Sequence, residues 1–404
     1  MDIKEYIKEN LPKTVRYQPT DDGPLFALPK PFTVPCADGM FQEMYYWDSY
    51  FTNIGLIDDG NIEQAKNNVE NIASMVERFG FVLNGSRQEF LNNSQPPFLS
   101  QMTREVYEAT EDLEWLARIY PSVVKEYHFW VTDRICENGL CRYDTQMPLP
   151  EWQIKRGKDL LVERLGYTPD LDDYALARGL FSVGESGWDI TPRFSYRTYD
   201  YTPVDLNSLL YSMEINLANF AGLLNKPDEK EMWEGYASAR ASAMREYLLG
   251  EDGIFYDYDL KYGKRHTLFN AACFYPLYFG LATAGEAEAL VSKLGEIEAE
   301  WGILACVESD VRGNFQWGYP NGWPPMQQMA VGALLRYGYK TDALRIAEKY
   351  VNLVESCFEQ TGHLWEKYNV VEGNANAASE YGTPAMLGWT WGVYRHFLKL
   401  LGRE

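Results

Sequence analysis

Apolar residues spaced three and four positions apart recur along much of this chain. The spacing is clearest in residues 61–79, where it includes Ile62, Ala65, Val69, Ile72, Met75, Val76 and Phe79. It returns in 205–224, 228–248, 327–337, 341–357 and 386–401. Because this spacing puts side chains on one face of an α-helix, each segment is predicted to be an amphipathic helix. The pattern therefore predicts an all-α fold.

The chain is long enough to bury a large core. Its 404 residues are 46% hydrophobic, which suits either one large helical domain or two to three ordinary domains. No low-complexity linker, change of composition or sequence repeat divides it. We therefore expect one domain over residues 1–404, with 1–30 as an N-terminal extension packed on it. Antiparallel helix pairs joined alternately by short and long connections can close into a toroid with the long loops at one end.

Charge and composition argue against several classes of partner. Lys and Arg number 37 against 58 Asp and Glu, and the formal charge of -21 repels nucleic acids and anionic membrane surfaces. No apolar run approaches the roughly 18 residues of a membrane span. The six cysteines form no CxxC pair and the four histidines no metal signature. Reduced thiols, a cytoplasmic location and no metal are expected.

Loops rich in Gly, Pro and aromatic residues separate the predicted helices. They are 31–48, 84–98, 143–157, 184–203, 312–325 and 362–384. Aromatic residues make up 15% of the chain, with 12 Trp and 29 Tyr, and such rings stack on the apolar faces of sugars. A thick aromatic core predicts the same figure, so composition alone leaves both interpretations open.

Residues 184–189, GESGWD, place two carboxyl groups beside a tryptophan in a stretch too irregular for a helix interior. A carboxyl group held against an indole is desolvated, which raises its pKa. A glycosidase general acid needs that property, because it must carry a proton near neutral pH and hand it to the leaving oxygen. Asp189 fits this role. The alternative is that Asp189 is the N-cap of the next segment.

The segment LWEKY, residues 364–368, holds a second candidate carboxyl group. Glu366 lies between two aromatic residues and close to a Gly- and Asn-rich loop. There it can activate a water molecule, with Glu380 in support. The alternative makes Glu366 a surface residue paired with Lys367 or a nearby arginine.

Two further segments suit a sugar-binding pocket. In FQEMYYWDSY, residues 41–50, Asp48 follows Trp47 and resembles an acceptor for sugar hydroxyls beside a stacking platform. Asp48 can instead simply cap the following helix. In QWGYPNGWPP, residues 316–325, two tryptophans and two amides stand in a turn fixed by Gly and Pro. Such a turn suits a pocket wall better than a core.

Taken together and in this order, these segments resemble the trehalase family of glycoside hydrolases. VPCADGMFQEMYYWDSY is similar to the family's first signature and QWGYPNGWPP to its second. The segments NGSRQEFLNNSQPPF, ESGWD, PVDLNSL, EKYNV, SEYG and GWTWGV follow its running order, and the resemblance covers residues 30 to 400. It implies an (α/α)6 barrel with long active-site loops at one end, no cofactor, and hydrolysis of an α-glycoside with inversion at the anomeric carbon.

The resemblance also implies site residues. The family's acid is the aspartate of ESGWD and its base is the glutamate of EKY, which are Asp189 and Glu366 here. Substrate contacts carried over in the same way are Phe41, Tyr45, Trp47, Asp48, Asn84, Gln95, Glu151, Gln316, Trp317, Trp323 and Glu380.

Three arginines that the family uses around trehalose are absent. Met40, Asn93 and Leu149 stand where the first signature, the SRSQPP segment and the RPES segment carry arginine, and Gly318 stands where an aspartate is usual. Guanidinium hydrogen bonds to hydroxyls are worth about 1.5–3 kcal/mol each. We therefore expect poor hydrolysis of trehalose, and a glucosyl unit held against a partner with fewer hydroxyls or a more apolar aglycone.

The leading prediction is an inverting α-glucosidase acting on trehalose or a related α-glucoside. One alternative is a hydrolase of the glucosylglycerate or mannosylglycerate type, which shares the fold and mechanism. A second is a non-catalytic sugar-binding protein, which would need neither carboxyl group. A third is a sugar epimerase, but four scattered histidines do not suggest the proton-shuttling pair that it needs.

Overall fold

The computed structural model describes residues 2–377 and 382–404, so that the predicted site residue Glu380 lies outside the described residues. Helices dominate, as predicted. The α-helices are α1 Ile3–Asn10, α2 Tyr46–Asp58, α3 Ile62–Phe79, α4 Leu99–Thr110, α5 Leu113–Asp133, α6 Glu151–Leu165, α7 Asp173–Glu185, α8 Val204–Leu223, α9 Pro227–Tyr247, α10 Tyr275–Tyr278, α11 Ala284–Ser292, α12 Leu294–Ile297, α13 Pro324–Arg336, α14 Lys340–Thr361 and α15 Gly388–Leu400. Short 3-10 helices are η1 Leu11–Thr14, η2 Gln88–Phe90, η3 Pro192–Phe194, η4 Thr198–Asp200 and η5 Ala271–Phe274.

Short antiparallel strands tie the loops together. β1 Val15–Arg16 pairs with β2 Phe32–Thr33, β6 Glu298–Ala299 with β7 Gly302–Ile303, and β8 Asn321–Gly322 with β9 Tyr368–Asn369. β4 Asp257–Asp259 lies between β3 Tyr201–Thr202 and β5 Lys264–His266. The β8–β9 pair joins the turn predicted as a pocket wall to the segment that carries Glu366.

The six predicted amphipathic segments are all helices. α3 buries Val69, Ile72 and Val76 and ends at Gly80, whose φ of 88° is the left-handed conformation that closes a helix. The other five are α8, α9, α13, α14 and α15, with ends shifted by a few residues from the prediction. The apolar spacing was therefore a sound guide, because each helix buries its apolar side chains.

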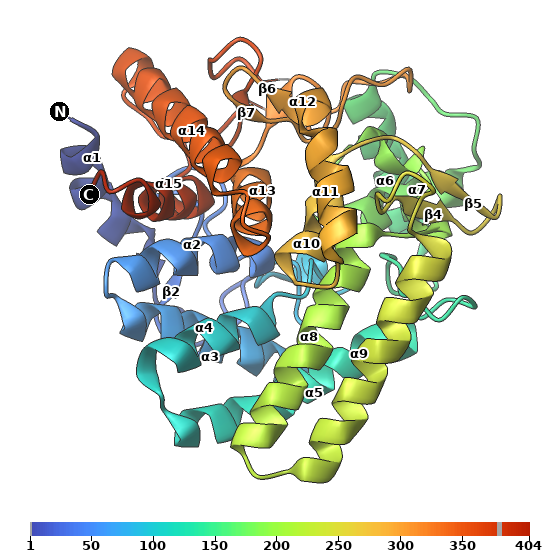
Figure 1. Ribbon diagram of the computed structural model, residues 1–404, viewed down its shortest axis with the longest axis horizontal. Helices are drawn as coiled ribbons and strands as arrows, with labels where there is room; N and C mark the ends of the chain where they lie inside the picture. Colours follow the sequence, from blue (N-terminus) through green and yellow to red (C-terminus); the bar gives the residue numbers. More distant parts are fainter. Residues whose placement is uncertain (1, 378–381) are drawn as a thin grey trace.

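Six helices form a closed ring. α2 contacts α4, and the contacts continue through α8, α10, α13 and α15 back to α2. α3, α5, α9 and α14 pack outside this ring (Figure 1). Inner and outer helices alternate along the chain, and several pairs are joined by short turns, such as 59–61 between α2 and α3. The predicted toroid is confirmed.

The N-terminal segment contacts two of the helices outside this ring, α14 and α3. The rings of Tyr6 and Phe358 lie 5.2 Å apart, and those of Phe26 and Phe79 lie 4.9 Å apart. α1 lies close to α15, so that the two ends of the chain meet on one side of the molecule (Figure 1).

α6 and α7 stand apart from the alternating helices. They lie between α5 and α8 in the chain and pack mainly against each other (Figure 1). The prediction of a loop over 143–157 is wrong for its second half, because α6 begins at Glu151, directly after Pro150, and ends before Gly166 with a φ of 73°. The residues between Pro150 and Gly166 include many strong helix formers, which favour a helix. The first turns of α2 and α13 and the end of α7 likewise lie within the loops predicted at 31–48, 312–325 and 184–203.

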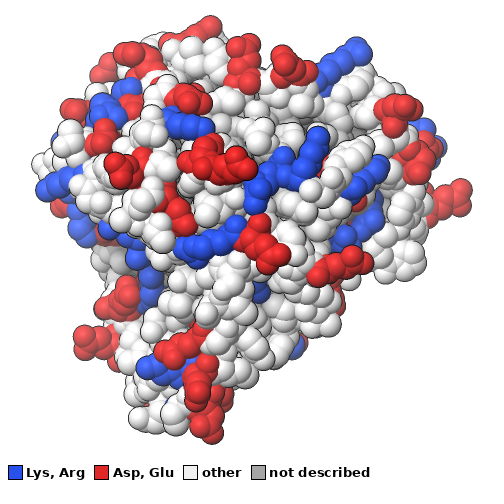
Figure 2. Space-filling model, turned by 45° about the vertical axis from the view of Figure 1, so that its right-hand side comes forward, with Lys and Arg blue, Asp and Glu red and all other residues white. Residues whose placement is uncertain are grey.

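The surface charge, the thiols and the helix lengths can be compared with the expectations from composition. Acidic and basic side chains are interspersed on the face shown in Figure 2, despite the formal charge of -21. Within the described chain, all six cysteines are free thiols, and no helix has both the length and the apolar character for crossing a membrane.

Candidate active site

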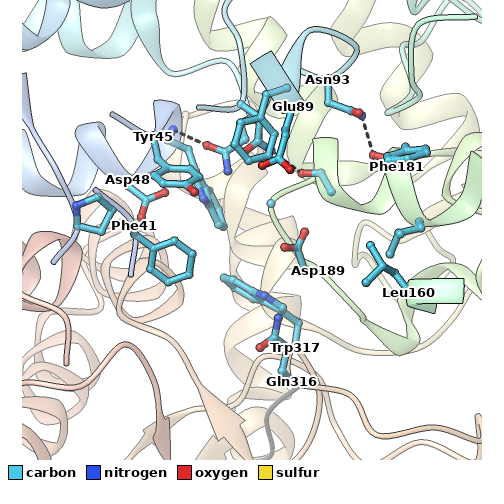
Figure 3. Close-up of a pocket in the computed structure, with 18 of the residues that line it drawn as sticks. Phe41, Tyr45, Asp48, Glu89, Asn93, Leu160, Phe181, Asp189, Gln316 and Trp317 are labelled. Carbon is cyan, nitrogen blue, oxygen red and sulfur yellow. Dashed lines mark hydrogen bonds between the residues drawn. The ribbon is translucent and has the colours of Figure 1, made fainter. Parts of the chain in front are cut away.

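A cavity of about 330 Å³ lies among the long loops, and all six loop segments named from the sequence contribute to its wall. α6 and α7 complete it. Figure 3 shows Phe41 and Asp48 on one side, Leu160 and Phe181 on the other, and Asp189 and Trp317 between them. The lining residues are Pro35, Phe41, Tyr45, Trp47, Asp48, Asn84, Glu89, Phe90, Asn93, Gln95, Trp152, Gln153, Arg156, Leu160, Arg164, Leu180, Phe181, Gly184, Gly187, Asp189, Gln316, Trp317, Trp323, Glu366, Met386 and Trp389.

Packed indole rings form part of the cavity wall. Trp317 and Trp323 stack with ring centroids 3.8 Å apart and 3° between their planes, and Trp47 lies 5.5 Å from Trp317. The backbone oxygen of Gln316 accepts hydrogen bonds from the Asn321 amide and the Trp323 indole N–H, both at 2.9 Å. These bonds fold residues 316–323 into a rigid turn. The indoles are therefore held in place before any ligand arrives.

The turn that carries Asp189 depends on Gly187. This glycine has a φ of 71°, and a Cβ atom added to it would lie 2.8 Å from the Trp47 indole. Only glycine satisfies both the left-handed backbone and the close approach. The turn therefore fixes Asp189 and Trp47 relative to each other.

Asp189 is a partly buried carboxyl group at the cavity. Burial raises its pKa to about 6, while the positive charge of Arg164 opposes that rise and the negative charge of Glu366 adds to it. The helix-capping alternative is wrong, because the N-cap of η3 is Thr191, whose hydroxyl accepts the Arg193 N–H. Asp189 can thus hold a proton in mildly acidic solution.

The other carboxylate of the GESGWD motif has a structural position. Glu185 is fully buried, and Arg134 donates to both of its oxygens at 2.8 and 2.9 Å. The same carboxylate accepts the backbone N–H groups of Ser94 and Asp144 at 3.0 and 2.8 Å. Glu185 therefore ties the end of α7 to two loops near the cavity.

Glu366 is buried rather than on the surface, so the alternative reading of a surface residue is wrong. Its pairing with Lys367 is present: the ammonium group lies 2.5 Å from Glu366 Oε2. The Trp389 indole N–H donates to the backbone oxygen of Glu366 at 3.0 Å. The Lys367 ammonium also lies 4.8 Å from the Trp323 ring centroid. The indoles of Trp389 and Trp323 thus hold the segment that carries Glu366 in place.

Asp48 is the third residue of α2 and is buried. Tyr45 occupies the N-cap position, so the proposal that Asp48 caps this helix is wrong. Burial raises the pKa of Asp48 well above its ordinary value, and the charges of Glu366 and Asp189 raise it further. Three carboxyl groups therefore meet around one cavity.

Most of the other predicted contacts line the cavity as well. Trp47 donates its backbone N–H to Gln95 Oε1 at 3.1 Å, and Asn84 donates to the backbone oxygen of Gly184 at 3.1 Å. The Phe41 ring meets that of Tyr45 edge to face at 5.5 Å. Gln316 lines the cavity beside Trp317. By contrast, Glu151 is an exposed residue at the start of α6 and does not line it.

The three positions at which the family has arginine have different surroundings in this structure. Met40 is 45% exposed and Leu149 is buried, and neither lines the cavity. Asn93 does line it, but its amide donates to the backbone oxygens of Phe181 and Asp144 at 2.7 and 3.3 Å (Figure 3). Met40 and Leu149 therefore give this cavity no apolar surface, and the expected preference for a more apolar aglycone stays a prediction.

Sequence reasoning missed the part of the wall that α6 and α7 supply. Arg156, Leu160 and Arg164 line the cavity from α6, and Leu180 and Phe181 line it from α7. The cavity thus contains guanidinium groups, although from positions other than those of the family motifs. The four-residue spacing of the three α6 residues is a signal for one helical face, but it does not show that this face lies at the cavity.

A closed ring of helices, with loops that gather carboxyl groups and stacked indoles around one cavity, defines a glycoside hydrolase of the helical-barrel class. The family model named Trehalase matches residues 2–402, and the chain belongs to the trehalase family.

Solved structures agree with this family. Neutral trehalase Nth1 from Saccharomyces cerevisiae is 29% identical over 91% of this chain and 73% of its own, with a TM-score of 0.77. A GH63 mannosylglycerate hydrolase from Thermus thermophilus shares the fold, at 19% identity over 98% of both chains and a TM-score of 0.65. The protein is a glycoside hydrolase that acts on a carbohydrate.

Proposed function

We propose that the protein is an inverting α-glucosidase with Asp189 as general acid and Glu366 as general base. In this reaction Glu366 accepts a proton from a water molecule, whose oxygen bonds to the anomeric carbon. The glycosidic carbon–oxygen bond breaks, and Asp189 gives its proton to the leaving oxygen. The proton taken up by Glu366 balances the one that Asp189 releases.

The observation that carries this proposal is the raised pKa of Asp189, about 6, in a cavity that Glu366 also lines. An acid that keeps its proton beside a second carboxyl group is the arrangement that glycoside hydrolysis requires. A non-catalytic sugar-binding protein has no need of it.

A glucosyl unit fits the side of the cavity that holds Trp47, Asp48 and Trp317. Indoles can stack on the sugar ring, and Asp48 can exchange hydrogen bonds with its hydroxyls. The neighbouring residues Phe41, Tyr45, Asn84, Gln95, Gln316 and Trp323 complete this subsite in the proposal.

The substrate in this proposal is trehalose or a related α-glucoside. The relative named neutral trehalase supports the first choice. Hydrolysis of a mannosylglycerate-type substrate is the alternative, suggested by the second relative. We also propose that residues 1–404 form one catalytic domain that works in the cytoplasm, which the free thiols support.

The test measures released sugar from a panel of α-linked glucosides, with NMR to identify the first anomer formed. Inversion predicts that the glucosyl unit is released as β-glucose; from trehalose the leaving glucose appears as α-glucose in equal amount. Asp189→Asn and Glu366→Gln should each lower kcat by at least roughly 10²–10⁴-fold, because neither amide can transfer the required proton. Glu359→Gln, at an exposed position on α14, is the matched control. Activity close to wild type in either variant removes that residue from the mechanism, and a first product that contains α-glucose without β-glucose rejects inversion.

A further inference from the structure

One face of α6 lies along the cavity opposite the proposed glucosyl side. Trp152, Arg156, Leu160 and Arg164 follow each other at four-residue steps, which places them in one row on a helix, and all four line the cavity. Figure 3 shows Leu160 and Phe181 across Asp189 from Phe41 and Asp48. Because Asp189 protonates the leaving oxygen in the proposed reaction, the leaving group lies on the α6 side.

The α6 row and the adjoining residues of α7 combine apolar and cationic side chains. Leu160, Leu180 and Phe181 supply apolar surface, while Arg156 and Arg164 supply two guanidinium groups. Asn93, which stands where the family has an arginine, uses its amide on backbone oxygens. The guanidinium groups that can recognise the leaving group among these residues therefore come from α6.

The ion pair of Arg156 can be exchanged for a ligand. Arg156 donates to Glu89 Oε1 at 3.0 Å, but the two side chains are 55% and 44% exposed. Such an exposed pair contributes only about 0–1 kcal/mol. Glu89 also lies 3.1 Å from Arg87, so it keeps a cationic partner if Arg156 turns to a ligand.

We propose that the α6 row selects glycosides whose leaving group carries an anion, a carboxylate or a phosphate. This inference rests on the proposed α-glucosidase function. A guanidinium group offers two parallel N–H donors that match these anions, and the hydrogen bonds are charge-assisted. The formal charge of -21 would otherwise repel an acidic substrate, so local cations are needed to admit one.

Two matched substrate pairs test the proposal and distinguish its two anion sources. The carboxylate arm compares α-glucosylglycerate with α-glucosylglycerol, and the phosphate arm compares trehalose 6-phosphate with trehalose. We expect kcat/KM to favour the anionic member of at least one pair by roughly tenfold, the effect of one charge-assisted contact. The preference should shrink in concentrated salt, because Arg156 is exposed.

Arg156→Gln should reduce that preference by most of its tenfold value. Lys155→Gln removes the same charge from the neighbouring, exposed position on α6, outside the cavity, and should leave the ratio unchanged. Arg164→Gln is compared at pH 5, where Asp189 keeps its proton, and should also reduce the ratio.

Equal hydrolysis of the neutral and anionic members, or an equal loss on both in Arg156→Gln, overturns the inference but leaves the α-glucosidase proposal standing. If none of the four compounds and no glucoside of the wider panel is cleaved, the proposed function itself fails.

Discussion

Glu185 and Asp189 lie four residues apart in one motif, yet their surroundings give them different properties. Glu185 is fixed by the Arg134 guanidinium and two backbone N–H groups, all of which stabilise its charge. Asp189 lies at the cavity, where burial favours its neutral form. The sequence shows two carboxylates in one motif, and only the contacts of each show that Glu185 is structural and that Asp189 lies at the cavity.

The pH dependence of kcat/KM should report on Asp189. A general acid must be protonated, so activity should fall as the pH rises through the apparent pKa of about 6. Arg164 lowers this pKa, and Arg164→Gln should therefore move the alkaline limb of the profile to higher pH. Profiles of kcat/KM for wild type, Arg164→Gln and the control Lys155→Gln would check this. An unmoved limb in Arg164→Gln would show that another group limits the reaction.

At the scale of elements, the loops and the α6–α7 hairpin supply most of the side chains that line the cavity, and the helices of the ring supply few. The motif at 316–325 predicted a pocket wall, because two tryptophans in a Gly- and Pro-bound turn have no place in a regular helix. α6 carries no comparable motif. Its role depends on where the hairpin lies relative to the ring, and local spacing of residues cannot specify that contact between distant segments.

Gly187→Ala tests the turn that joins Asp189 to Trp47. The new methyl group meets both a φ of 71° and an indole at 2.8 Å, so we expect a loss of roughly 1–3 kcal/mol in the free energy of unfolding. The displaced turn should also lower kcat/KM, since catalysis depends on geometry of this accuracy.

Gly235→Ala is the control for that prediction. Gly235 lies in the interior of α9, with no atom within 4 Å of an added Cβ, and the substitution should stabilise the protein by about 0.5–1 kcal/mol. Urea unfolding and kinetics on both variants provide the comparison. If Gly187→Ala behaves like Gly235→Ala, the turn is not constrained as described.

At the scale of the whole molecule, apolar spacing predicted three helices of the ring, α8, α13 and α15, whereas the closed barrel was expected from the family resemblance. In α8, for example, residues on nearly every turn are buried. Its apolar residues nevertheless follow the helical spacing between Asp205 and Lys226. Position 366 shows the limit of that reasoning. A glutamate beside a lysine is usually exposed, and Glu366 is buried only because the loop folds against Trp389 and Trp323.

The stability of the whole protein should fall between pH 5 and pH 8. Burial raises the pKa of Glu126 to about 8, where it accepts the Tyr46 hydroxyl at 2.5 Å, and raises that of Asp189 to about 6. A carboxyl group whose pKa is raised on folding stabilises the folded state fully below its unfolded pKa, near 4. That stabilisation is lost as the pH rises through the folded pKa, by at most about 1.4 kcal/mol per pH unit for each group.

Glu126→Gln should flatten this dependence, because an amide keeps an acceptor for Tyr46 but does not ionise. Carboxyl groups whose pKa is lowered, such as Asp58 beside His396 and Lys399, act in the opposite sense, and their effect lies below pH 4. Burial lowers the pKa of His266, which also acts in the opposite sense and does so within the interval from pH 5 to 8, but wild type and Glu126→Gln share His266, so the difference between their slopes isolates Glu126. Urea unfolding at several pH values would measure the slope for wild type, Glu126→Gln and the surface control Glu359→Gln. A slope that Glu126→Gln shares with wild type would show that Glu126 is already ionised in the folded protein at pH 5.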